Sequence, residues 1–385
     1  MLMPALICSG AESTGPGSAA PPRPIVIGQI ASLTGNNPGG RDNELGAALA
    51  AGEINAAGGL LGQRRVEIVI EDDATQVQGA VSACGRLLER HPVAIIGTSF
   101  SNAGLAVIPD IEKAAVPYVS TGAADAQVEP IRRYVFMTPL TGKLVGEQLL
   151  RYLQFKGVRR LAVVYDSDSQ FARDGWAKQR LALTRFGIQL VAEQAVKVDT
   201  RDFAPQLRLI PGSGAEAIMG WVTGPPAVGL VKAYGASDRL IPLFLSHGAA
   251  SPAFIAAVGQ AGEGATVATA LAAVAGQLPD SAVRRAAVAM SEHFTQSYGH
   301  APSQFAIDGY VAVKLIAAAL TKAGVDQPQA VQQALTHLSL VTPQGEYRYS
   351  ADDHSGLQMG DVAITEIRDG KFALTSWSKA QLGHR

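Results

Sequence analysis

Two short segments of small, hydroxyl-bearing residues follow apolar runs in the first third of the chain. They are residues 97–102 (GTSFSN), which open a helical pattern, and residues 120–125 (STGAAD). A segment that follows a buried parallel strand presents backbone N–H groups and the start of the next helix, and both attract anions. Both segments are therefore candidates for holding a carboxylate. Ordinary helix caps and turns are the competing interpretation.

Signatures of catalysis are weak. Residues 97–101 fail the G-x-S-x-G nucleophile pattern because Ser101 replaces the last glycine. The S-x-x-K match that begins at Ser376 falls at the end of an expected terminal strand and lacks its companion motifs. Residues 352–354 (DDH) could ligate a metal, but an exposed turn is favoured, and the seven histidines show no metal-ligand spacing. We expect no enzyme, no cofactor and no metal.

Strands and helices alternate along the chain, and this alternation positions the two segments. Such a rhythm predicts parallel sheets covered on both faces, with right-handed crossovers. A first series of strands is expected at residues 25–30, 66–70, 93–97 and 116–119. A helix at residues 144–155 restarts the rhythm, and its strands are expected at 161–165, 188–192, 217–219 and 242–245. The fold class is therefore α/β, with two doubly wound sheets in one chain.

The C-terminal part departs from this rhythm. Helical patterns at residues 281–298 and 304–323 precede an end that resembles antiparallel strands. Those strands are expected at 345–349, 361–367 and 372–377.

Composition excludes several classes of function. The 385 residues are 47% hydrophobic and carry a formal net charge of −1, so the chain is globular and has no basic excess for nucleic acid. No uninterrupted apolar run reaches the roughly 18 residues of a membrane span. Cys8 and Cys84 are too few for a disulfide scaffold, and we do not expect them to pair.

The first 23 residues differ from the rest. An apolar start is followed by a run rich in small residues and Pro, and no basic residue precedes Arg23. A secretory signal begins with a positively charged region. Residues 1–23 are therefore either an incomplete signal peptide or a disordered tail.

Four stretches carry a family resemblance. They are residues 27–35 (IGQIASLTG), 46–62 (GAALAAGEINAAGGLLG), the acidic pair at 72–73 and residues 116–123 (VPYVSTGA). Together they resemble the periplasmic branched-chain amino acid-binding proteins, the solute receptors of bacterial ABC importers.

The resemblance runs from residue 24 to about residue 379 and implies two Rossmann-like lobes joined by three crossings that close around a ligand. It implies a periplasmic, monomeric receptor with an ABC importer permease as its partner. Lobe 1 is expected at residues 24–141 with 269–344, and lobe 2 at 142–268 with 345–385.

The resemblance also implies site residues. Ser101 would give its hydroxyl to the ligand carboxylate. Gly122 and Ala124 align with a pair that presents backbone donors and a threonine hydroxyl, which Ala124 lacks. Phe171 stands where the family usually has a covering tyrosine, and His247 where amino acid binders have an acid. The ligand-side set is completed by Phe100, Thr121, Thr223, Tyr310 and the loop residue Arg41, for which core packing or a solvated charge is the alternative.

His247 decides the expected ligand. An ammonium group without a carboxylate partner costs several kcal/mol when it is desolvated. A histidine suits an oxo group, a hydroxyl or a second acidic group instead. We therefore predict a small carboxylate ligand without a free α-amino group, an aromatic or branched 2-oxo or hydroxy acid. The alternatives are a gene-regulating sensor of the same fold and a true branched-chain amino acid receptor.

Overall fold

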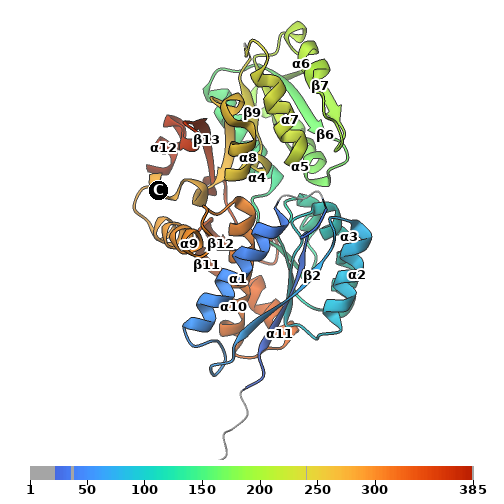
Figure 1. The fold of residues 1–385 in the computed structure, drawn as a ribbon, viewed down its shortest axis with the longest axis vertical. Coiled ribbons are helices and arrows are strands. Elements are labelled where there is room, and N and C mark those ends of the chain that lie inside the picture. The colour runs from blue at the N-terminus through green and yellow to red at the C-terminus, as the bar shows by residue number, and fades with distance from the viewer. Residues whose placement is uncertain (1–21, 36–38, 240, 384–385) are drawn as a thin grey trace, which may run out of the picture.

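The computed structural model describes residues 22–35, 39–239 and 241–383. Figure 1 shows two α/β bodies stacked along the long axis, which we call lobe 1 (the lower body) and lobe 2 (the upper body). Cys8 and nearly all of the expected leader, residues 1–21, lie outside the described residues.

Lobe 1 holds a five-stranded sheet in the order β2-β1-β3-β4-β5, and all of its strand pairs are parallel. Side chains alternate between two layers, so Ile96 packs toward α1 and α10 while its neighbour Ile95 packs toward α2 and α3. The strands are β1 (Ile25–Ala31), β2 (Val66–Asp72), β3 (Ala94–Gly97), β4 (Tyr118–Ser120) and β5 (Val135–Met137). The helices are α1 (Gly40–Ala56), α2 (Val77–Leu88), α3 (Ser101–Ala114), α10 (Gln304–Ala323) and α11 (Pro328–Thr336).

Lobe 2 holds a seven-stranded sheet in the order β14-β13-β10-β9-β8-β6-β7, in which β13 and β14 are antiparallel to their neighbours. Leu161 and Val163 of β6 pack toward α4 and α5, while Ala162 and Val164 pack toward α7 and α8. The strands are β6 (Arg160–Asp166), β7 (Gln189–Val196), β8 (Ala217–Trp221), β9 (Leu243–Leu245), β10 (Thr266–Ala270), β13 (Val362–Arg368) and β14 (Lys371–Leu374). The helices are α4 (Gly142–Phe155), α5 (Gln170–Ala182), α6 (Ala204–Leu209), α7 (Gly224–Gly235), α8 (Pro252–Val258) and α12 (Ser376–Gly383).

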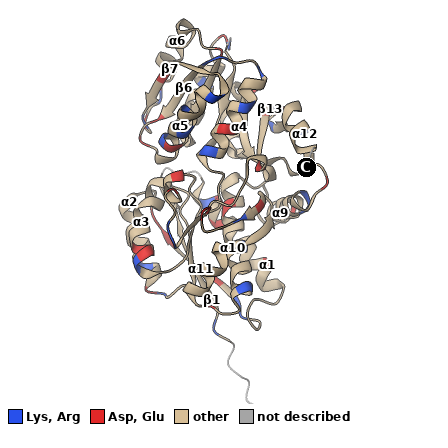
Figure 2. Cartoon of the chain, turned by 180° about the vertical axis from the view of Figure 1, so that it is seen from behind, with Lys and Arg blue, Asp and Glu red and all other residues tan. Residues whose placement is uncertain are grey.

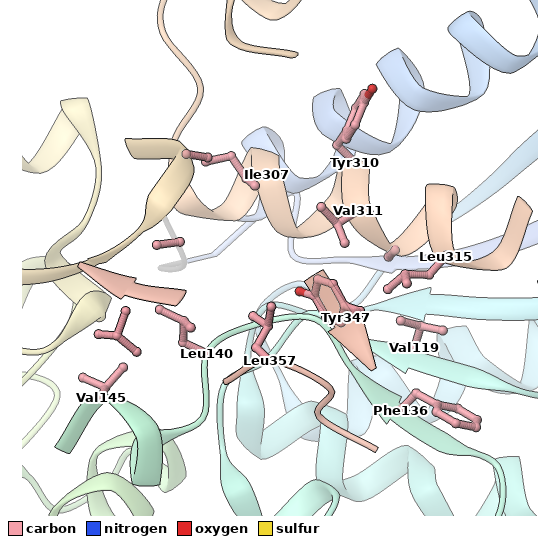
Figure 3. Close-up of a cluster of buried hydrophobic side chains, with 14 of the residues drawn as sticks. Val119, Phe136, Leu140, Val145, Ile307, Tyr310, Val311, Leu315, Tyr347 and Leu357 are labelled. Atoms are coloured by element: carbon pink, nitrogen blue, oxygen red, sulfur yellow. The ribbon is translucent and has the colours of Figure 1, made fainter. Parts of the chain in front are cut away.

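Three connections join the lobes: residues 138–141, residues 271–303 with α9 (Ala282–Tyr298), and residues 349–361. A two-stranded hairpin, β11 (Ser339–Thr342) with β12 (Gly345–Arg348), lies beside them. The expected boundary between lobe 1 and lobe 2, between residues 344 and 345, falls inside this hairpin. One apolar cluster runs through the junction. In Figure 3, Ile307 and Val311 of α10 lie on one side of this cluster, and Leu140 and Tyr347 face them from the other side.

Several short elements, among them α8 and β11, were missed by the sequence prediction, and one expected strand was wrong. Strand β5 is only three residues long and follows the charged pair Arg132 and Arg133, so its apolar pattern is too short to be recognised as a strand. Helix α11 was also missed. The expected strand at 372–377 ends at Leu374, because the Thr375 hydroxyl accepts a hydrogen bond from the Ser378 N–H (3.1 Å) and so caps α12. The S-x-x-K match therefore lies on a helix.

Among the described residues, only α10 is long and apolar enough to cross a membrane by length and composition. Its most apolar window is 78% buried inside the protein, so α10 is the central core helix of lobe 1. Figure 2 shows charges of both signs scattered over both lobes, which agrees with the net charge of −1.

Candidate ligand-binding site

The acidic pair at the end of β2 fixes the loops of lobe 1. Asp73 accepts hydrogen bonds from the hydroxyls of Ser32 (3.1 Å) and Thr98. Asp72 accepts from the Leu33 N–H (3.0 Å) and the Thr34 hydroxyl (2.6 Å). These contacts tie together the segments that follow β1, β2 and β3, and they hold the start of α3 in place.

Ser101 and Gly122 meet at this edge of lobe 1. Ser101 is the first residue of α3 and is 4% exposed. A Cβ atom on Gly122 would lie 3.1 Å from the Ser101 hydroxyl oxygen, so only glycine leaves that hydroxyl unobstructed. The Gly122 N–H itself donates to the Ser120 hydroxyl (3.1 Å). Thr121 is also engaged, because its hydroxyl donates to Asn43 (3.4 Å), while Ala124 is fully buried.

Phe171, Thr223 and His247 meet in lobe 2. The Phe171 ring stands edge-on to the His247 ring at 5.2 Å between centroids, near the start of α5. The Thr223 hydroxyl donates to the Gly248 carbonyl (3.0 Å), and a Cβ atom on Gly248 would lie 3.0 Å from the Phe171 ring. Three residues that are distant in sequence thus lie together and form the lobe 2 part of the candidate site.

His247 is buried without a hydrogen bond of normal geometry, although its ring lies near the Leu140 backbone. Its side chain is 4% exposed, and neither ring nitrogen has a partner among the described residues. Burial lowers the pKa of His247 to about 4, and the nearby Leu140 backbone only partly opposes that shift. At neutral pH the ring therefore offers one donor and one acceptor and carries no charge. The adjacent Ser246 hydroxyl is also buried and unpaired within the described chain.

The structure gives other contacts for three further expected residues. Arg41 pairs with Glu44 on the first turn of α1 (2.6 Å), and its side chain is 67% exposed. Tyr310 sits between α10 and α1, and its hydroxyl donates to Glu53 (2.6 Å). Phe100 is partly buried against the α2–α3 side of the sheet.

The turn with residues 352–354 is not wholly exposed as the sequence suggested. His354 is buried, stacks on Phe136 with ring centroids 4.2 Å apart, and uses Nδ1 toward the Val135 carbonyl (2.8 Å). No group of three or more His, Cys, Asp or Glu side chains within the described ranges could hold a metal ion. Cys84 is buried in α2, and burial raises the pKa of its thiol to about 12.

Sequence reasoning missed two residues at the junction of the lobes. Asp125 of lobe 1 accepts the N–H groups of Gly142 (2.6 Å) and Lys143 (2.9 Å) and so caps the first helix of lobe 2. Burial raises the pKa of Asp125 to about 6, although those two hydrogen bonds oppose the shift. Asn102, next to Ser101, donates to the Asp168 carbonyl of lobe 2 (3.1 Å). Residues so far apart in sequence leave no local signal.

Asn102 links the two halves of the site. Ser101 and Gly122 lie on its lobe 1 side, and Phe171 with His247 lies on its lobe 2 side. Two α/β lobes with a candidate half-site on each side of their junction are the arrangement expected of a two-lobe solute-binding protein.

The comparison with known families agrees. The family model described as "Periplasmic binding protein" matches residues 24–371, and the chain belongs to that family. This confirms the resemblance and the α/β fold class that the sequence predicted.

Known relatives cover nearly the whole chain. An "Amino acid binding protein" of Pseudomonas aeruginosa is 24% identical over 90% of this chain and 91% of its own length. An extracellular ligand-binding receptor from Rhodopseudomonas palustris has a TM-score of 0.84 at 22% identity, covering 92% of this chain and all of that one.

Two solved structures of the same fold hold different ligands. A solute-binding protein of an ABC transporter from R. palustris, in complex with benzoate, has a TM-score of 0.80 at 20% identity over 91% of this chain and 95% of that one. The branched-chain amino acid transporter substrate-binding protein of Streptococcus pneumoniae, in complex with isoleucine, has a TM-score of 0.80 at 22% identity over 91% and 98%.

Proposed function

We propose that this protein is the periplasmic receptor of an ABC importer and that it closes, as a monomer and without catalysis, around a small carboxylate. The favoured ligand is an aromatic or branched 2-oxo or hydroxy acid rather than a free amino acid. The observation that carries this choice is His247, a buried side chain beside Phe171 whose ring nitrogens make no hydrogen bond of normal geometry and whose pKa is lowered by burial.

The chemistry of His247 favours a neutral polar group on the ligand. One ring nitrogen donates and the other accepts, so the ring can bind a hydroxyl or an oxo group without any change in charge. An ammonium group there would face a histidine that resists protonation and supplies no negative charge, and its desolvation would be uncompensated. Phe171 supplies an apolar wall that suits an aromatic or branched side chain.

In lobe 1, the Ser101 hydroxyl at the start of α3 suits the ligand carboxylate. The first N–H groups of a helix and the positive end of its dipole favour an anion at that position. The benzoate-bound neighbour supports an acid as the ligand. The relative named as an amino acid binding protein and the isoleucine-bound neighbour favour the alternative, a true amino acid receptor.

A thermal-shift screen on ligand-stripped protein distinguishes the two. The panel sets leucine, isoleucine and valine beside benzoate and aromatic and branched 2-oxo and hydroxy acids. A ligand at about 100 times its Kd adds about 2.7 kcal/mol to the free energy of unfolding and raises Tm visibly. A shift with the acids alone supports the proposal, and a shift with leucine contradicts it.

Two variants then test the half-sites. Ser101→Ala should weaken a bound acid about five- to tenfold by calorimetry, because it removes a hydrogen bond to a charged group. Ser82→Ala on α2, away from the site, is the matched control. An affinity that stays within about twofold in Ser101→Ala would show that the carboxylate binds elsewhere. His247→Glu should weaken acids by at least about tenfold through repulsion, and stronger acid binding would count against the role of His247.

A further inference from the structure

One face of α5 carries a row of contacts to lobe 1. Gln170, Asp174 and Lys178 are spaced by four residues and therefore lie on the same side of the helix. The Gln170 N–H donates to the side-chain oxygen of Asn102 (2.9 Å), and Asp174 accepts the N–H of Ala126 (2.9 Å). Lys178 forms an ion pair with Glu129, one turn further along. We call the residues of these contacts, together with the Asp168 carbonyl, the α5 seam.

Hydrogen bonds within lobe 2 support the α5 seam. The Gln170 side-chain amide donates to Asp174 (2.6 Å), which ties two successive positions of the row together. Asn102 makes two hydrogen bonds to lobe 2, one to the Asp168 carbonyl and one from the Gln170 N–H, so its amide orientation is set by both. The Asn102 bonds are partly buried, whereas the side chains of Lys178 and Glu129 are 36% and 44% exposed. Asn102 is therefore the stronger contact, since exposed ion pairs contribute little.

The α5 seam begins where the proposed ligand would bind. Asn102 follows Ser101 in lobe 1, and Gln170 precedes Phe171 in lobe 2. The seam joins the same two segments that the ligand would bridge, yet it uses different atoms. It forms only when the lobes are as close as they are in this structure.

We propose that the α5 seam is a ligand-independent closing element, in which Asn102 is the main positioning residue. The seam adds to the stability of the closed state and so raises the affinity for every ligand by the same factor. The apparent Kd of a receptor scales with the fraction of molecules in the binding-competent state. The seam also holds part of the ligand-free population closed. The affinity effect rests on the function proposed above, whereas the ligand-free closure does not.

The test combines calorimetry with small-angle X-ray scattering on the full chain. Asn102→Ala should raise the Kd about tenfold for each acid that binds, and the ratio between ligands should stay unchanged. Its dissociation rate should rise while its association rate stays close to that of the wild type. The ligand-free variant should show a larger radius of gyration than the ligand-free wild type. Asp174→Ala should change both quantities in the same direction and covers the case in which Asn102→Ala folds poorly.

Arg180→Ala is the matched control. Arg180 lies on another face of α5 and pairs with Glu193 of β7 inside lobe 2 (2.9 Å), so its loss should change neither affinity nor scattering. Unequal factors for different ligands in Asn102→Ala would make Asn102 a ligand contact and overturn the proposal. Unchanged Kd and scattering would do the same. If no compound in the panel binds, the proposed function fails. The ligand-free scattering then tests the α5 seam alone, and a profile unchanged in Asn102→Ala would overturn its closing role.

Discussion

Asp308 is a buried carboxyl group whose protonation state can be tested directly. It lies in the second turn of α10, is 2% exposed, and has no cationic partner among the described residues. Its Oδ1 accepts hydrogen bonds from the side-chain amides of Gln344 (2.7 Å) and Gln304 (3.0 Å). Burial outweighs these two bonds and raises the pKa of Asp308 to about 8. The carboxyl group should therefore be protonated in the folded protein at neutral pH.

The consequence is a dependence of stability on pH. The folded state holds a proton on Asp308 up to about pH 8, whereas the unfolded chain loses it near the ordinary value of 3.8. The free energy of unfolding should then fall as pH rises between about 4 and 8, by up to about 1.4 kcal/mol per pH unit from this group. Asp308→Asn removes the titration while its side-chain oxygen keeps both glutamine bonds. The added NH2 group lowers stability at acidic pH, but the difference from the wild type should shrink or reverse by pH 8.

Urea unfolding from pH 5 to pH 8 measures this difference directly. Other titrating groups, such as Asp125 and His247, are shared by both proteins and cancel in the subtraction. Asp352→Asn, in an exposed turn, is the matched control and should follow the wild type at every pH. Parallel pH profiles for the wild type and Asp308→Asn would refute a protonated Asp308.

Two glycine substitutions test packing. Gly122→Ala should weaken ligand binding by more than about tenfold with little change in Tm, because its Cβ would press on the Ser101 hydroxyl at 3.1 Å; calorimetry that finds full affinity would argue against Ser101 as a contact. Gly175→Ala should cost about 2–3 kcal/mol in urea unfolding, since its Cβ would lie 2.1 Å from the Trp221 ring. Gly52→Ala in α1 has open space around its Cβ and should stabilise by up to about 1 kcal/mol; equal effects for the two helix substitutions would contradict the close approach of α5 to Trp221.

The sequence predicted the fold well where its pattern is local. Long helices and apolar strands repeat a period that can be read within ten or so residues, so the two series of strands and α10 were found. Strand β5 is too short to show a period, and α12 begins where a threonine cap overrides an apparent strand.

The site was less predictable because its partners are distant in sequence. Residues matched through the resemblance, such as Phe171 and His247, do lie together, since the fold fixes the ends of their strands and helices. Arg41 and Tyr310, also expected on the ligand side, are each engaged by a nearby carboxylate. Asn102 and Gln170 are 68 residues apart, so nothing local in the sequence marks their contact.

In the stretch at residues 46–62, which carries part of the family resemblance, the glycine at position 46 is explained by packing rather than by a ligand. A Cβ atom on Gly46 would lie 1.8 Å from the Ala306 carbonyl oxygen, and one on Gly309 would lie 2.1 Å from that of Asn43. Glycines at these positions let the backbones of α1 and α10 come into direct contact. The fold needs this packing whichever ligand it binds. The same architecture therefore holds benzoate in one neighbour and isoleucine in another. Under the function proposed above, the choice between an acid and an amino acid would depend on the charge of buried side chains at the strand ends. In this chain the proposal assigns that role to His247, which is buried.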